Sequence, residues 1–110
     1  HPVCCAAGLA CLQALLEEKR IDEVAGKAGL FKELLKTRLI KDVRTAGLLI
    51  AVEFESFEIN KRIIDRCIEN GLITDWFLFA PECMRIAPPL VISEEQIRNA
   101  CEIINRACED

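Results

Sequence analysis

The sequence has few of the residue types from which metal and redox sites are built. It contains one histidine and no tyrosine, and none of its seven cysteines is spaced as the C-x-x-C pair of zinc and dithiol sites. Most of the cysteines fall on apolar helix positions, where a free thiol behaves as a small hydrophobe. We therefore expect no metal site, and reduced, buried thiols in a cytoplasmic protein. The cysteines concerned are Cys4, Cys5, Cys11, Cys67, Cys83, Cys101 and Cys108.

Positive charge and long apolar runs are also scarce. Lysine and arginine number 14 against 18 aspartates and glutamates, which gives a formal net charge of -4. That balance argues against the basic surface with which nucleic-acid-binding domains meet phosphates. No stretch reaches the ~18 apolar residues that a membrane-spanning helix needs. We expect neither nucleic acid nor a membrane among the partners.

What the sequence does contain is enough apolar material for one core. With 110 residues and 52% hydrophobic content, it predicts a single domain over residues 1–110. Apolar spacing and turn residues predict helices and short strands in alternation, which gives an α/β fold of the α+β type. We expect two layers, with a short, mainly antiparallel sheet packed with about four helices. The predicted helices cover residues 2–16, 21–37, 57–70 and a last segment from 94, and the predicted strands cover 39–43, 48–54, 72–74 and 84–87.

The first predicted helix is apolar on every side. Between residues 2 and 16 only Gln13 is polar, and a helix without a polar face has to be buried all round. A domain of this size covers one or two sides of such a helix at most. We therefore expect the rest of its surface to face a missing part of the chain or another subunit, and the chain to be a fragment of a larger body.

Residues 83–96 are the most informative stretch. Arg85 lies in an otherwise apolar strand, and Pro88 and Pro89 end that strand because proline donates no ladder hydrogen bond. Ser93 is a good N-cap, and Gln96 three residues later predicts a capping box at the start of the last helix. The pattern therefore places an arginine at a strand end.

Two interpretations of Arg85 follow from spacing alone. Its stem could pack on the sheet while its guanidinium reaches solvent or a nearby carboxylate. Alternatively, a guanidinium fixed at a strand end could bind a ligand carboxylate through two hydrogen bonds, which a lysine cannot do equally well.

Four stretches, in order, resemble one enzyme family. Residues 84–97 are similar to the C-terminal end of the class III pyridoxal-phosphate aminotransferases, the family of acetylornithine, ornithine and 4-aminobutyrate aminotransferases. Residues 1–10 resemble the helix that follows the family's phosphate-contacting loop. Residues 43–53 resemble its hairpin, and residues 67–73 the end of its next helix. Together the four matches cover nearly the whole chain.

The resemblance implies that the chain is the C-terminal small domain of such an enzyme. The parent would be a homodimer that uses pyridoxal phosphate to move an amino group from an ornithine-, acetylornithine- or 4-aminobutyrate-like donor to a 2-oxo acid. In that family the Schiff-base lysine and the cofactor's other partners lie upstream, in the large domain. The chain would then hold no catalytic, cofactor-binding or metal-binding residue, and would be inactive alone. Its six lysines fall on polar faces or a strand edge: Lys19, Lys27, Lys32, Lys36, Lys41 and Lys61.

By the same resemblance, Arg85 matches the small-domain arginine that meets a substrate carboxylate or a switching glutamate, so it is the predicted substrate-binding residue. The match has departures. The hairpin turn, Thr45-Ala46-Gly47, keeps only one glycine, and residues 75–79 occupy a segment that the family varies, which leaves the donor open. For the aromatic side chains of residues 75–79 we expect core or interface packing.

Two other classes remain open. A free-standing α/β binding or regulatory module without catalysis would be a stable monomer. A thiol-based redox or metal protein would need a cysteine of low pKa or a bound metal.

Overall fold

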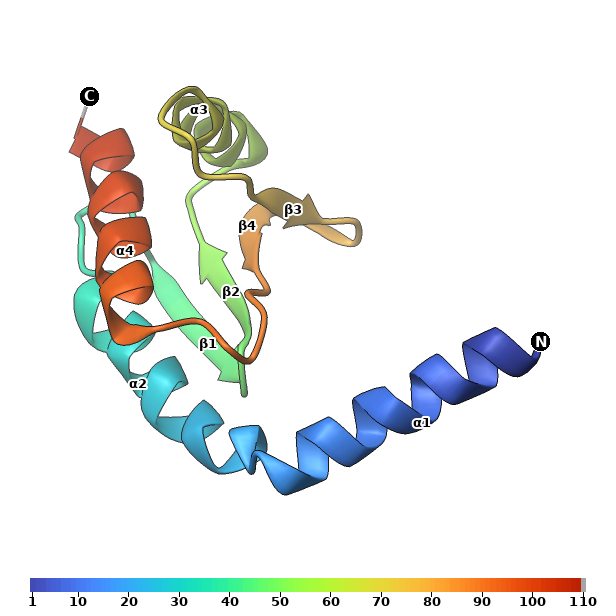
Figure 1. The fold of residues 1–110 in the computed structure, drawn as a ribbon. Helices are drawn as coiled ribbons and strands as arrows, with labels where there is room; N and C mark the ends of the chain where they lie inside the picture. Colours follow the sequence, from blue (N-terminus) through green and yellow to red (C-terminus); the bar gives the residue numbers. More distant parts are fainter. Residues whose placement is uncertain (110) are drawn as a thin grey trace.

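The structure is a computed structural model that describes residues 1–109. It contains four α-helices, one short 3₁₀-helix and one four-stranded antiparallel sheet, which confirms the predicted α/β fold class (Figure 1). In chain order the elements are α1 (Pro2–Glu17), η1 (Arg20–Glu23), α2 (Val24–Leu34), β1 (Asp42–Ala46), β2 (Leu49–Glu53), α3 (Phe57–Glu69), β3 (Asp75–Phe77), β4 (Ala80–Ile86) and α4 (Glu94–Glu109).

The sheet has the spatial order β1-β2-β4-β3. Its first hairpin turns at Gly47, whose φ of 61° lies in the left-handed region where glycine is unstrained. A Cβ atom at this position would lie 2.9 Å from Val24 Cγ1, so a side chain would also collide with the start of α2. The turn is displaced from its prediction, because Thr45 and Ala46 continue β1.

Helices α2, α3 and α4 cover one face of the sheet, where the core lies (Figure 1). The sheet and the helices contribute apolar side chains that are almost fully buried, so this face is closed to solvent. The other face carries most of the charged residues of the strands, including Asp42, Arg44, Glu53 and Arg85. The largest buried side chains include Phe31, Leu35, Ile50, Val52, Phe54, Ile63, Met84, Ile97 and Ile104.

Two predicted strands were placed too early in the chain. β1 begins at Asp42 and not at residue 39, because Ile40 N–H donates to Thr37 O (3.2 Å) in a turn. β3 begins at Asp75 and not at residue 72. Residues 39, 40 and 72 are apolar because they pack against the core from loops.

The end of α3 explains the second error. Gly71, with φ of 83°, donates to Ile68 O, and Leu72 N–H donates to Cys67 O at 2.8 Å. These two bonds make a Schellman motif, in which an apolar residue just past the glycine packs back on the helix. Leu72 therefore completes a helix end, and its apolar character does not mark a strand.

The predicted second helix also divides. Residues 20–23 form the 3₁₀ turn η1, and α2 ends at Leu34, three residues before the predicted limit. Lys19, at φ 51°, is the one described non-glycine residue with positive φ, and it separates α1 from η1.

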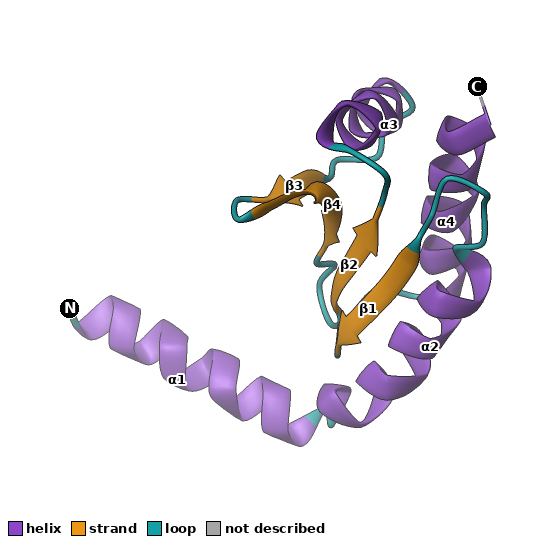
Figure 2. Cartoon of the chain, turned by 180° about the vertical axis from the view of Figure 1, so that it is seen from behind, coloured by secondary structure: helices purple, strands orange, loops and turns teal. Residues whose placement is uncertain are grey.

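Helix α1 is present as predicted and projects away from the sheet and the other helices (Figure 2), and within residues 1–109 none of its residues is buried. It leaves the rest of the fold as an arm whose described contacts are with η1 at its C-terminal end. Val3, Leu9 and Leu16 are exposed along it. The domain therefore covers no side of this helix, where the sequence predicted that it would cover at least one.

The cysteines were predicted to be buried, and for α1 this was wrong because the arm is exposed. Cys4, Cys5 and Cys11 are accessible, while the other four are buried, with Cys67, Cys101 and Cys108 in the core beneath the helices. Burial raises the pKa of Cys101 to about 12, and burial together with the nearby Cys108 raises that of Cys67 to about 11.

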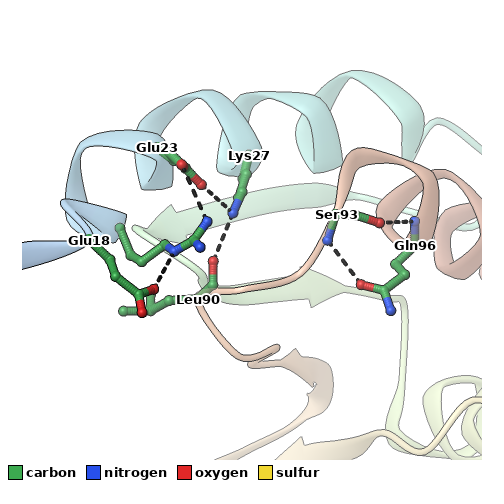
Figure 3. Close-up of polar contacts among 7 residues, drawn as sticks. Glu18, Glu23, Lys27, Leu90, Ser93 and Gln96 are labelled. Carbon is green, nitrogen blue, oxygen red and sulfur yellow. Dashed lines mark hydrogen bonds and ion pairs between the residues drawn. The ribbon is translucent and has the colours of Figure 1, made fainter. Parts of the chain in front are cut away.

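The capping box at the start of α4 is confirmed (Figure 3). Gln96 N–H donates to Ser93 Oγ at 3.1 Å, and Ser93 N–H donates to Gln96 Oε1 at 2.9 Å. The two bonds satisfy amides that a helix start leaves without partners. They fix the residue at which the chain enters α4 after the double proline.

We expect Ser93→Ala to lower the free energy of unfolding of the 110-residue chain by about 1 kcal/mol, because an N-cap acceptor is lost. Urea denaturation followed by circular dichroism measures the change. The matched control is Asn99→Ala, at an exposed position inside the same helix, where alanine's higher helix propensity should stabilise slightly. Equal stabilities for Ser93→Ala and the unmodified chain would contradict the capping role.

The thiols give a second expectation. At pH 8, iodoacetamide should alkylate Cys4, Cys5 and Cys11 of the folded chain quickly and leave the buried Cys67 and Cys101 unmodified until denaturant is added, because raised pKa values leave little thiolate there. Intact mass followed over time counts the adducts. A fourth fast adduct on the native chain would contradict the burial.

Candidate functional site

The open face of the sheet positions Arg85. The strand pairing aligns Arg44 on β1, Ala51 on β2, Arg85 on β4 and Asp75 on β3 in one row across the sheet. Side chains at paired positions share a face, and the core-facing neighbour Met84 is fully buried. Arg85 therefore points away from the helices, and its side chain keeps 47% of its exposure.

Arg85 has one ionic partner among the described residues. Its Nη2 atom donates to Asp75 Oδ2 at 3.2 Å, and the Asp75 side chain is about half exposed. The carbonyl oxygen of Arg85 accepts a hydrogen bond from Thr74 Oγ1 at 2.8 Å. The backbone of this residue is therefore held from β3's side, while its guanidinium remains accessible.

A second arginine lies on the same face, which sequence reasoning missed. Arg44 is ion-paired with Glu53 on β2 and lies 3.4 Å from Asp42 Oδ2. Its Nη2 atom also lies 3.4 Å from Cys83 Sγ on β4. The hydrogen bond that Arg44 donates to the Glu53 carboxylate is the main reason that the pKa of Arg44 is raised. Alternation along both strands would have placed Arg44 and Arg85 on one face, had the pairing register been known.

The two arginines give this face groups that can bind an anion. Its cations are guanidiniums, which stay protonated. Cys83 is buried, and burial raises its pKa, so it is a poor nucleophile. The chemistry available to these residues is the recognition and orientation of a carboxylate.

One lysine departs from its prediction. Lys27 was expected on a polar face, but its side chain is only 12% exposed, and its Nζ atom donates to Leu90 O at 2.7 Å. The same ammonium lies 2.8 Å from Glu23 and lowers the pKa of that carboxyl group. It is buried because it joins α2 to the loop before α4.

None of the described lysines lies in an apolar pocket that would suit a Schiff base. Lys27 is committed to Leu90 and Glu23, Lys61 pairs with Asp65 at 2.6 Å, and Lys41 pairs with Glu55 at 3.1 Å. The residues of this chain therefore do not fit pyridoxal phosphate by themselves. Within residues 1–109 no cluster of His, Cys, Asp or Glu could hold a metal ion, and no helix is long and apolar enough to cross a membrane.

The aromatic segment before β4 has two parts. Trp76 packs against the core and meets Phe57 edge to face, with ring centroids 5.4 Å apart. Phe79, at the tip of the β3–β4 hairpin, is 95% exposed, and Leu78 beside it is also exposed. Core packing accounts for Trp76, whereas the hairpin tip has no cover within this chain.

A comparison with protein families decides the identity of the fold. The profile described as aminotransferase class-III matches residues 1–108. The chain belongs to this family. The resemblance seen in residues 1–10, 43–53, 67–73 and 84–97 is thereby confirmed.

Curated class III aminotransferases show the same relationship over part of their length. The chain is 36% identical to the ornithine aminotransferase of Plasmodium chabaudi chabaudi, over 94% of this chain and 26% of that protein. It is 29% identical to the acetylornithine aminotransferase of Caldanaerobacter subterraneus, over 96% of this chain and 27% of that protein. The chain spans about a quarter of the length of these relatives.

Solved aminotransferase structures contain the same arrangement. An aminotransferase of Bacillus anthracis superposes with a TM-score of 0.90 at 27% identity, over 99% of this chain and 28% of that one. The ornithine aminotransferase of Toxoplasma gondii gives a TM-score of 0.85 at 31% identity, over 98% of this chain and 27% of that one. Both likenesses again involve little more than a quarter of the larger chain.

Proposed function

We propose that the chain is the C-terminal small domain of a pyridoxal-phosphate-dependent aminotransferase. The complete enzyme would transfer the amino group of an ornithine-, acetylornithine- or 4-aminobutyrate-like donor to a 2-oxo acid. Family membership supports the reaction class, and the ornithine and acetylornithine aminotransferases among the relatives support the donor class. The chain's share of their length supports its being one domain of several.

The role we propose for this domain is to bind the substrate's carboxylate through Arg85. The observation that carries this role is the accessible guanidinium of Arg85 on the open face of the sheet. In the described part of the chain it is held by one exposed ionic partner, Asp75. An exposed ion pair of this kind contributes little to stability. A substrate carboxylate that forms two parallel hydrogen bonds with the guanidinium can therefore replace it.

Pyridoxal phosphate, when bound in the complete enzyme, supplies the electron sink that amino-group transfer requires. The lysine that holds it would come from the larger part of the protein. This chain's contribution is to orient the donor and then the acceptor by their carboxylates. A fixed orientation matters because reacting atoms have to be held in a narrow geometry for the chemical step to be fast.

The partners we propose are the remainder of the enzyme and a second subunit. The exposed apolar surface of α1 supports this, because a helix without a polar face is stable only when it is covered. Free thiols throughout the described residues support a cytoplasmic location. The same exposed helix disfavours the free-standing binding or regulatory module.

In the complete enzyme, Arg85→Ala should lower kcat/KM for a carboxylate-bearing donor by about 100-fold, since a charged hydrogen-bonded pair contributes about 2–3 kcal/mol. Arg85→Lys keeps the charge but not the two-pronged geometry, so its activity should be intermediate. Steady-state kinetics with ornithine, N-acetylornithine and 4-aminobutyrate measure the loss. Unchanged kinetics for Arg85→Ala with every donor and acceptor would show that Arg85 does not bind the substrate carboxylate.

The 110-residue chain, supplied with pyridoxal phosphate, amino donor and 2-oxo acid, should show no turnover, because its lysines are paired or exposed. Amino-acid product analysis at high protein concentration checks this. The complete enzyme under the same conditions is the positive control. Turnover by the 110-residue chain alone would contradict the proposal that the catalytic lysine lies in the larger part of the protein.

A further inference from the structure

The segment that follows Arg85 crosses an apolar cavity. Residues 87–89 run from the end of β4 toward α4 over a hollow of about 290 Å³. Side chains of α2 and α4 line its far side, including Phe31, Ala100 and Ile104. Because this space is not filled, core packing alone does not fix the position of the crossing segment.

Backbone bonding gives the crossing segment little support. Pro88 and Pro89 have no N–H group to donate, and the pairing of β4 with β2 ends at Ile86. Pro89 O accepts from Ile92 N–H at 3.0 Å, which closes the turn before α4. The position of the segment therefore depends on contacts at its two ends.

Each end is held by one side chain from another element. At the start, Thr74 Oγ1 donates to Arg85 O at 2.8 Å. At the far end, Lys27 Nζ donates to Leu90 O at 2.7 Å (Figure 3). The Lys27 side chain is nearly buried, and Glu23 at 2.8 Å orients its ammonium.

The Lys27 anchor also connects to the joint between α1 and α2. Glu23 lies 3.6 Å from Arg20, and Arg20 lies 2.9 Å from Glu18 at the end of α1. The Arg20–Glu18 pair spans Lys19, the left-handed residue between α1 and η1, and the Arg20–Glu23 pair continues from it to the start of α2. The crossing segment is thereby tied to the part of the fold that leads to the α1 arm.

We propose that Lys27 and Thr74 are positioning residues for Arg85. They pin the two ends of the crossing segment, and the double proline between them is stiff because each ring fixes its φ angle. Displacement at Leu90 is then passed to the end of β4 and shifts the Arg85 guanidinium. This inference rests on the proposed function, in which Arg85 binds the substrate carboxylate.

The first test measures how firmly Lys27 holds the crossing segment, and it does not depend on enzyme activity. Hydrogen exchange of the complete enzyme compares Lys27→Met, which keeps the apolar stem, with Lys32→Met, an exposed lysine of the same helix. The amides of Arg85, Ile86, Ala87 and residues 90–92 should exchange faster in Lys27→Met only, and Lys27→Arg should restore protection. Exchange equal to that of the unmodified enzyme would overturn the anchoring role of Lys27. Thr74→Val, which removes the hydroxyl but keeps the side-chain volume, tests the other end in the same way.

The second test is a double-mutant cycle in the complete enzyme. Lys27→Met and Thr74→Val should each raise KM for the amino-acid donor about 10-fold with little change in kcat. The reason is that a misplaced Arg85 guanidinium forms poorer hydrogen bonds with the donor's carboxylate. Neither should affect the corresponding decarboxylated amine. In the Arg85→Ala background neither should cause a further loss.

The outcomes separate two failures. Suppose that Arg85→Ala weakens binding of the amino-acid donor, and that Lys27→Met raises KM as much in the Arg85→Ala background as in the unmodified enzyme. The positioning inference is then wrong and the proposed function stands. An equal loss for the decarboxylated amine also overturns the inference, because it indicates general destabilisation. If Arg85→Ala leaves the kinetics with the amino-acid donor unchanged, the proposed role of Arg85 is wrong. The positioning role of Lys27 and Thr74 is then wrong as well.

Discussion

Antiparallel strands direct successive side chains to opposite faces of the sheet. In this sheet that alternation decides which residues enter the core and which lie on the open face. The register that pairs Val52 with Met84 directs both side chains into the core, and it directs Ala51 and Arg85 to the open face. A slip of one residue would bury the guanidinium of Arg85 and expose Met84. Burying an unpaired cation is far more unfavourable than any single contact in this fold is favourable. The apolar core therefore fixes the register, and the register fixes the site.

The two faces of the sheet also differ in how much they contribute to stability. Helices α2, α3 and α4 cover one face, and the apolar side chains that stabilise the fold lie mainly on that side. The open face, the exposed hairpin tip at Phe79 and the α1 arm make no contribution to this core. Residues that a larger enzyme would use are thus free to differ without loss of the fold, while the covered face sets the geometry in which they are presented.

Local signals predicted the helices of this chain better than its strands. Ser93 and Gln96 form the predicted capping box, and Gly71 ends α3 as predicted. Leu72 and Leu39 misled the strand assignment, because a residue that caps a helix or lines a loop is as apolar as one in a buried strand. The position of Arg85 at a strand end followed from the double proline, but its predicted role came from the family resemblance. Arg44 and Lys27 were missed because their contacts join residues far apart in the sequence.

The two arginines of the open face differ in a way that bears on which of them meets a ligand. Arg44 is held by Asp42 on its own strand and by Glu53 on β2, and it also touches Cys83 on β4, so three neighbouring side chains fix it. Among residues 1–109, Arg85 has Asp75 as its one ionic partner, at 3.2 Å and half exposed. A carboxylate that approached Arg44 would have to displace several contacts at once, whereas at Arg85 it would exchange one carboxylate for another. The charge of the two groups is the same, and their difference in availability is set by their neighbours on the sheet. This asymmetry favours Arg85 as the ligand-binding arginine. Arg44 instead connects β1 to β2 and β4 through its contacts with Glu53 and Cys83.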